Sequence, residues 1–263
     1  MFILCKGALA KEPYIVPVSE VPVYSLEELC YYMYNNIYSI TEEFFDERLV
    51  TWLREEVNCD SLSKKMEVLI QQRHDVKDLV VTLLCSCDYY KEEEVRNLVE
   101  VLNRISHLPP HKKNKIKADA YLSAGKYGKS LQEYKELLYG ELAGQFTTEE
   151  YGNVLHNQAI ALYYVSSYYE AARGFKEAYA RNHREESRDQ YLYTLLLGGE
   201  QQKFEEESGA LGMKPEETAA LKRNYMAAKE KGQGGEEDFA FIDTCKKELR
   251  ASYSELEGGQ NGI

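Results

Sequence analysis

The sequence has no long apolar run and no apolar stretch of the kind that begins an exported protein. The longest apolar run, residues 79–85, is far too short to cross a bilayer. Residues 1–10 are largely apolar, but Lys6 interrupts them, so no signal-peptide core forms. These absences predict a cytoplasmic protein that does not span a membrane.

An excess of positive charge is also lacking. The chain of 263 residues has 32 Lys and Arg against 44 Asp and Glu, a net charge of −12. Nucleic acids and anionic membranes require a basic face, so neither is expected as the main partner. Residues 1–60 hold four basic against eleven acidic side chains, whereas residues 61–200 are nearly balanced. An acidic N-terminal region and a neutral region after it suggest two surfaces with different tasks.

Catalytic signatures are absent as well. The sequence has no Gly-rich phosphate loop, no GxSxG elbow and no HExxH motif. Cys85-Ser-Cys87 with His107 and His111 is the one arrangement that invites a zinc reading, but a helix would point the two thiols about 200° apart. Buried packing is therefore expected for Cys85. No metal, no cofactor and no enzymatic activity are predicted.

The six cysteines follow no disulfide framework pattern. In a chain without an export signal they are most simply reduced, buried thiols. The six are Cys5, Cys30, Cys59, Cys85, Cys87 and Cys245.

Tyrosine is abundant by contrast, with 22 residues beside six prolines and one tryptophan. Several occur as neighbours, such as Tyr163–Tyr164 and Tyr168–Tyr169. A tyrosine ring can fill a seam between helices while its hydroxyl reaches water or a partner. Half-buried packing on helices is the simpler interpretation of this abundance, and recognition by stacking is the alternative.

A repeat with an offset of 41 residues is the most informative pattern. Small residues match small ones, and large apolar or aromatic residues match large ones. The first copy contains Ala118, Tyr121, Gly125, Tyr127, Ser130, Tyr134 and Leu137, and the second contains Ala159, Leu162, Ser166, Tyr168, Ala171, Phe175 and Ala178. Each copy is a helical hairpin that cannot bury its apolar face alone, so it must stack on neighbours.

Helices are expected nearly everywhere from periodicity and breakers. The predicted ranges are 26–38, 42–57, 63–72, 76–88, 90–106, 112–124, 127–140, 149–166, 168–181, 185–199, 201–210, 215–231 and 236–255. Residues 13–24 are the exception, because β-branched residues and two internal prolines predict an extended segment or an edge strand. Ser25 and Glu28 are expected to form a capping box, and Asp75 to cap the helix that follows it.

Leu108-Pro-Pro110 predicts the boundary between two halves. An acidic helical region is expected over residues 1–110, an array of helical hairpins with C-terminal capping helices over 111–256, and a disordered Gly-rich tail over 257–263. The fold class is all-α. The large apolar side chains Phe44, Phe45, Leu49 and Trp52 either pack within the chain or present an aromatic surface.

The two repeat copies resemble the tetratricopeptide family. That family places a small residue midway in the first helix, Gly and Tyr at the turn, and Ala, then an aromatic, then Ala on the second helix. Residues 114–138 and 152–179 resemble this pattern. The resemblance implies a short right-handed α-solenoid. It departs from the family in lacking closing prolines, in its long linker at 141–148 and in Leu137; the third pair, with Leu192, Leu195, Leu196 and Phe204, is degenerate.

In the family, the first helix of each pair lines a concave groove. The resemblance therefore implies the groove residues Lys112, Lys115, Asp119, Leu122, Asn153, His156, Asn157, Ile160 and Tyr163. Lys115 and Asn157 match two positions of the clamp with which one subgroup grips a peptide carboxylate. Asp119, Ser187 and Gln190 depart from that clamp, so a mixed groove of Tyr, His and amide groups is expected instead.

A non-catalytic scaffold that binds a protein or peptide in this groove is the favoured function. A peptide-responsive regulator, in which the bound peptide shifts the N-terminal helices, is the first alternative. An enzyme with a site at the junction of the two halves is the second. The pattern leaves the identity of the partner and the oligomeric state open.

Overall fold

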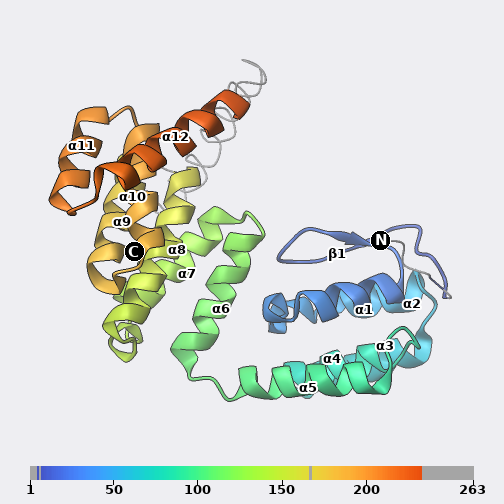
Figure 1. Ribbon diagram of the computed structural model, residues 1–263. Helices are drawn as coiled ribbons and strands as arrows, with labels where there is room; N and C mark the ends of the chain where they lie inside the picture. The colour runs from blue at the N-terminus through green and yellow to red at the C-terminus, as the bar shows by residue number, and fades with distance from the viewer. Residues whose placement is uncertain (1–4, 6, 166–167, 233–263) are drawn as a thin grey trace, which may run out of the picture. The chain divides into compact units, whose positions relative to one another are not determined.

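The computed structural model describes residues 5, 7–165 and 168–232, and the chain divides into two compact units with separate cores, residues 1–125 and 126–263 (Figure 1). The described residues form twelve α-helices, three 3-10 helices and one two-stranded sheet. The expected all-α class is therefore confirmed.

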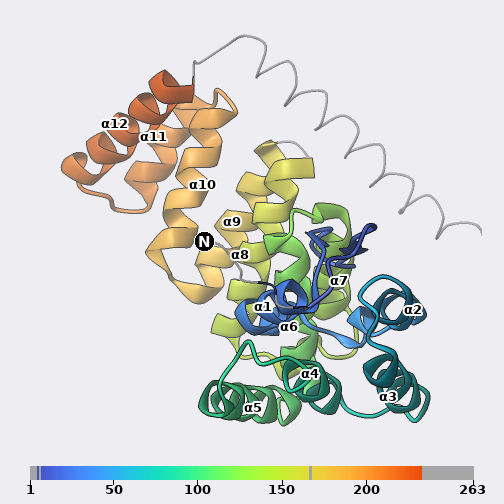
Figure 2. The same ribbon diagram turned by 90° about the vertical axis from the view of Figure 1, so that its right-hand side faces the viewer.

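Six α-helices and two 3-10 helices make up the N-terminal unit. They are α1 (Leu26–Asn35), η1 (Ile37–Ser39), η2 (Glu42–Phe44), α2 (Glu47–Glu55), α3 (Asp60–Gln71), α4 (Val76–Leu84), α5 (Glu92–Ser106) and α6 (Pro110–Ser123). Consecutive helices pack in pairs, α2 on α3, α3 on α4 and α4 on α5 (Figure 2). Each helix predicted before residue 125 is present, and only the ends differ, chiefly where 42–57 divides into η2 and α2.

The extended segment expected at 13–24 is a small hairpin. Strand β1 (Tyr14–Ile15) pairs antiparallel with β2 (Pro22–Val23), and Glu20 in the turn has a φ of 57°. Both strands lie at an edge, as the prolines require.

The start of α1 follows half of the predicted capping box. The Ser25 hydroxyl accepts the Glu28 N–H at 3.1 Å, but the Glu28 carboxylate accepts from Tyr24 rather than from Ser25. Asp75 occupies the N-cap position of α4 without a side-chain capping hydrogen bond.

Aromatic side chains from separate segments fill the N-terminal core. The Tyr14 hydroxyl donates to the Phe44 carbonyl at 2.9 Å, and the Trp52 indole N–H donates to the Glu12 carbonyl at 3.0 Å. Phe44, Phe45, Leu49 and Trp52 are all buried. Of the two alternatives for these side chains, packing within the chain is confirmed.

Helix α6 belongs to the N-terminal unit, which shifts the boundary from the one expected at Pro110. Helix α5 ends before Leu108-Pro-Pro110 as predicted, but the compact units divide after Gly125. The reason is that α6 packs on η1, while Lys117 and Tyr121 bind Glu43 at 3.0 and 2.8 Å. The two helices of the first predicted hairpin, α6 and α7, therefore fall in different units.

The described residues of the C-terminal unit form six α-helices and one 3-10 helix. They are α7 (Tyr127–Tyr139), η3 (Ala143–Gln145), α8 (Thr148–Val165), α9 (Tyr168–Asn182), α10 (Glu185–Leu197), α11 (Gln201–Ala210) and α12 (Pro215–Gly232). From α7 to α11 each helix packs on the next along the chain, and α12 packs on α10 (Figure 1). Ser166, the helix expected at 236–255 and the tail at 257–263 lie outside the described residues.

Small residues bring α8 and α9 into close contact. A Cβ added to Gly174 would lie 2.9 Å from the Ala159 Cβ, and one added to Gly152 would lie 2.8 Å from the Asn182 backbone nitrogen. Distances below 3 Å leave no room for a side chain at either glycine. Ala159, Ala171 and Phe175 are buried beside this contact, in agreement with the repeat pattern.

Candidate functional site

The nine groove residues implied by the tetratricopeptide resemblance lie on two helices. Lys112, Lys115, Asp119 and Leu122 lie on α6 of the N-terminal unit, and Asn153, His156, Asn157, Ile160 and Tyr163 lie on α8 of the C-terminal unit. All nine are half-buried. The surroundings of the four residues on α6 differ from those of the five on α8.

On α6, the two charged residues at the centre of the set bind each other. The Lys115 ammonium lies 2.6 Å from the Asp119 carboxylate, one helical turn away. Lys115 therefore compensates the negative charge of Asp119, the residue that departs from the carboxylate clamp. Neither residue therefore presents an uncompensated charge to a binding partner.

On α8, Asn153 and His156 belong to a polar network that joins three helices. The Asn182 amide at the end of α9 donates to the Asn153 side-chain oxygen at 3.1 Å and to the Ser187 hydroxyl at 3.0 Å. Ser187 on α10 lies 2.9 Å from His156 Nδ1. The Asn182 oxygen accepts the Arg184 backbone N–H at 3.0 Å. Every polar atom of the Asn182 side chain is thus used between α8 and α10.

The His156 ring is partly shielded from water. It makes an edge contact with the Phe175 ring, with centroids 5.2 Å apart. Burial, and to a smaller extent the charge of Arg184, lower the pKa of His156 below its usual 6.5. The imidazole is therefore neutral at pH 7 and acts as a hydrogen-bonding group rather than as a cation.

Sequence reasoning missed Asn182 and placed Ser187 in the wrong setting. Ser187 was considered as a groove position of a carboxylate clamp, but it is buried and bonded to His156 and Asn182. A signal for Asn182 does exist in the sequence. It continues the buried stripe of Ala171, Phe175 and Ala178 on α9, and a polar residue at such a position requires internal partners.

The remaining α8 residues form a neutral surface of mixed character. Ile160 and Tyr163 pack partly on the core of α8 to α11, and Asn157 lies between the network and these apolar groups along the helix. The Tyr163 ring lies 5.2 Å from Tyr164 and 5.5 Å from Tyr168. Burial raises the pKa of Tyr163, so its phenol stays protonated and can donate a hydrogen bond.

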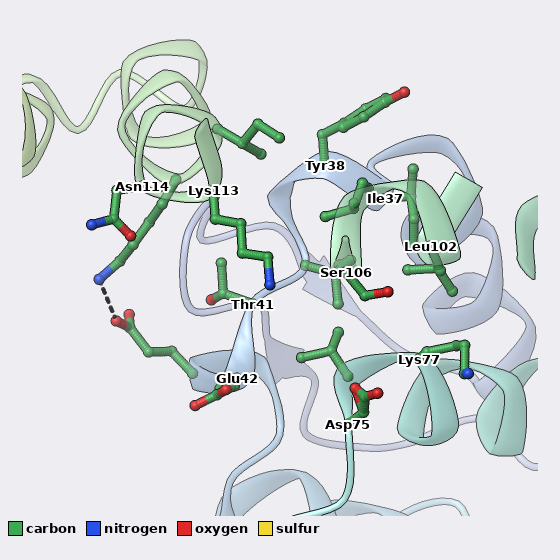
Figure 3. Close-up of a pocket in the computed structure, with 16 residues that line it drawn as sticks. Ile37, Tyr38, Thr41, Glu42, Asp75, Lys77, Leu102, Ser106, Lys113 and Asn114 are labelled. Atoms are coloured by element: carbon green, nitrogen blue, oxygen red, sulfur yellow. Dashed lines mark ion pairs between the residues drawn. The ribbon is translucent and has the colours of Figure 1, made fainter. Parts of the chain in front are cut away.

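A cavity of about 430 Å³ lies within the N-terminal unit and was not expected from the sequence (Figure 3). Its walls combine apolar residues of η1, α4, α5 and α6 with charged groups of both signs. The Lys117–Glu43 ion pair belongs to its lining, and Figure 3 shows Lys113 directed towards Thr41. The Thr41 hydroxyl is buried there without a hydrogen-bond partner. The lining suits a small amphipathic molecule but contains no recognisable nucleophile and base pair.

The cysteines depart from the expectation of buried thiols. Of the five in the described residues, Cys30 is buried, Cys5, Cys59 and Cys87 are half-buried, and Cys85 is exposed. Helix α4 ends at Leu84, short of the predicted residue 88, and Cys85 lies off the face of its buried residues Leu79, Val80, Leu83 and Leu84. Cys245 lies outside the described residues. Within the described residues, no three His, Cys, Asp or Glu side chains gather to hold a metal ion.

Comparison with known proteins adds no relative from which a role could be transferred. No protein-family model, curated protein or solved structure matches the chain. In the described part of the chain, no helix is long and apolar enough to cross a membrane. The class that these observations define is an all-α protein of two compact units.

Proposed function

We propose that the C-terminal unit is a non-catalytic module that binds a protein or peptide on a face formed by α8 and α10, in the manner of a tetratricopeptide-like array. The observation that carries this proposal is the network of His156, Asn182 and Ser187. It links α8 directly to α10, the helices that correspond to the first members of two successive hairpins. In helical-repeat proteins such helices line the binding surface.

The close contact of α8 with α9 supports the same arrangement. Gly174 and Ala159 let the two helices approach until no side chain fits between them. Such packing holds α8 at a fixed distance from its neighbours, so its outward side chains are pre-organised. Pre-organised surfaces bind with a smaller entropic cost than mobile ones.

The network divides the predicted groove residues by role. Asn153 and His156 each commit one polar side-chain atom to Asn182 or Ser187, so we assign them the role of positioning the face. Asn157, Ile160 and Tyr163 remain as the contact residues on α8. Gln190 joins them, because it is exposed on α10 one turn after Ser187.

The chemistry of this face favours an uncharged stretch of peptide. Gln190 offers a donor and an acceptor to a peptide backbone, Asn157 adds a polar amide, and Ile160 and Tyr163 offer apolar contact. The nearest cation on α10, Arg188, lies 2.9 Å from Asp189, which compensates its charge. An extended or helical peptide therefore fits better than a peptide gripped by its terminal carboxylate.

A peptide-display selection against the full chain, followed by affinity measurements, tests the proposal. Replacing Asn157 and Tyr163 together by alanine should weaken binding of a selected peptide by at least about tenfold, because buried aromatic and amide contacts each contribute about 1–2 kcal/mol. Fluorescence anisotropy with labelled peptide gives the affinity, and circular dichroism checks that the variant is folded.

The matched control is Tyr169→Ala. Tyr169 lies on α9, is 65% exposed and has the Lys203 ammonium 5.5 Å from its ring centroid. It should leave the affinity unchanged. Full affinity in the folded double variant, or an equal loss in Tyr169→Ala, would rule out the α8–α10 face.

A further inference from the structure

Two cysteines far apart in sequence meet in the N-terminal unit. The sulfurs of Cys30 and Cys87 lie 3.3 Å apart, although 57 positions separate the residues. Cys30 lies on α1, and Cys87 lies in the segment between α4 and α5. Helix α1 packs on α4, which brings the two thiols together.

The two thiols differ in their access to solvent. Cys30 is completely buried, whereas Cys87 is half-buried and lines two cavities of about 350 and 320 Å³. Cys30 is not among the residues lining either cavity. A small reagent can therefore reach the Cys87 sulfur first, and Cys30 is positioned directly behind it.

The two thiols also differ in acidity. When both groups are thiols, Cys87 donates to the Cys30 sulfur, and the Cys30 thiol donates to the Leu83 carbonyl at 3.5 Å. Once Cys87 is ionised, it accepts a hydrogen bond from Cys30, and this bond, helped by the backbone N–H of Tyr89, lowers the pKa of Cys87 to about 7 against the opposing effects of burial and of Glu27 and Asp88. The same hydrogen bond, with burial, raises the pKa of Cys30. About half of the Cys87 side chains are then thiolates at pH 7, and the thiolate is the reactive form of cysteine.

We propose that Cys30 and Cys87 form a redox-active dithiol, in which Cys87 reacts with a small-molecule disulfide and Cys30 resolves the product. The 3.3 Å contact, the enclosed position of Cys30 and the two cavities at Cys87 together define an attacking and a resolving thiol. This site is independent of the peptide-binding face proposed for the C-terminal unit.

The reaction proceeds in two exchange steps. The Cys87 thiolate attacks one sulfur of the small disulfide, whose S–S bond breaks; one half leaves as a thiolate and the other stays bonded to Cys87. Cys30 then gives its proton to the thiolate that left, and its sulfur attacks the Cys87 sulfur. The mixed disulfide breaks, and its remaining half leaves and takes a proton from water. Counting the proton that Cys87 released to water on ionising, the dithiol loses two hydrogens and gains one disulfide, and the reagent is reduced to two thiols.

Neighbouring cysteines are poorly suited to either role. Cys59 lines the first cavity with Cys87, but burial raises the pKa of its thiol, which keeps it protonated. Cys85 is exposed, at the C-cap of α4. For Cys30 and Cys87, the sulfurs need to approach by only about 1 Å to form a disulfide bond.

Treatment of the full chain with oxidised glutathione at pH 7 tests the proposal. After quenching and digestion without reductant, mass spectrometry should find the Cys30–Cys87 disulfide as the main product. In Cys30→Ser the reaction should stop with glutathione on Cys87, because the resolving thiol is missing. Glutathione spread over several cysteines, or a link of Cys87 to Cys59 or Cys85, would overturn the proposal.

The pH dependence separates a tuned thiol from a merely accessible one. The initial rate of Cys87 modification should be half-maximal near pH 7 and about fivefold faster at pH 7 than that of an ordinary thiol. Cys30→Ser keeps a hydroxyl donor and should keep this midpoint, whereas Cys30→Ala removes the donor and should move the midpoint to higher pH. An unchanged midpoint in a folded Cys30→Ala protein would contradict the role of Cys30.

Discussion

In the N-terminal unit large side chains from separate segments meet in one core, whereas in the C-terminal unit small residues let successive helices approach closely. Tyr14, Phe44 and Trp52 come from β1, η2 and α2, and their rings lie about 6 Å apart in two of the pairings. The corresponding contact in the C-terminal unit is that of Gly174 with Ala159. Removal of side-chain volume should therefore destabilise the N-terminal core most. In the C-terminal unit, added side-chain volume at the contact of α8 with α9 should have the larger effect.

Phe44→Ala should have the largest effect on stability. Phe44 is completely buried and touches Tyr14, Tyr32 and Phe45. Its truncation should cost about 3–5 kcal/mol, because the surrounding rings cannot collapse fully into the space. Hydrogen exchange of the α1 and α2 amides measures the loss. Tyr38→Ala, at a ring that is 57% exposed, should stay within about 0.5 kcal/mol of the parent. An equal loss of stability in the two variants would contradict the close packing of Phe44 in this core.

Gly174→Ala should destabilise the C-terminal unit by about 1–3 kcal/mol. The added methyl meets the Ala159 Cβ at 2.9 Å, so α8 and α9 must move apart. Gly209→Ala on α11 is the matched control, because no atom beyond its chain neighbours and its own helix backbone lies within 4 Å of the added Cβ. There alanine should stabilise by about 0.5–1 kcal/mol through helix propensity. Denaturant unfolding of the two variants should show opposite signs, and the same sign in both would refute close packing at Gly174.

The smallest expected effect is the pH dependence of the contribution of His156 to stability. The pKa of His156 is lower in the folded chain than its usual 6.5, so the unfolded chain binds its proton more readily. Its contribution to stability is complete above about pH 6.5 and is lost as the pH falls towards the lower folded value. His156→Gln should remove this step. The difference in unfolding free energy between parent and variant measures this contribution. It is followed from about pH 7.5 to about pH 5, across the range in which histidine titrates. A difference that does not change with pH would contradict burial of a neutral imidazole.

Local pattern was sufficient for much of the fold. Apolar periodicity, the cap at Ser25 and the stop at Leu108-Pro-Pro110 predicted the helices before residue 125 and their order. An apolar run was a weaker guide, as Cys85 demonstrates. It continues the run in sequence, but it lies off the face of Leu79, Leu83 and Leu84 and is exposed.

The sites were less accessible to sequence reasoning, because they depend on which faces meet. The resemblance of the repeat to the tetratricopeptide family implied that Asn153 and His156 lie on one helix face. It could not show that Asn182 and Ser187 take up their hydrogen bonds. Likewise, nothing local relates Cys30 to Cys87, since only the packing of α1 on α4 brings them together.

Hydrogen exchange of the full chain with and without a selected peptide tests the central claim most directly. The account predicts that peptide slows exchange in α8 around residues 157–163 and in α10 around residue 190. Protection confined to the residues that line the N-terminal cavity, or to the outer face of α9, would contradict it.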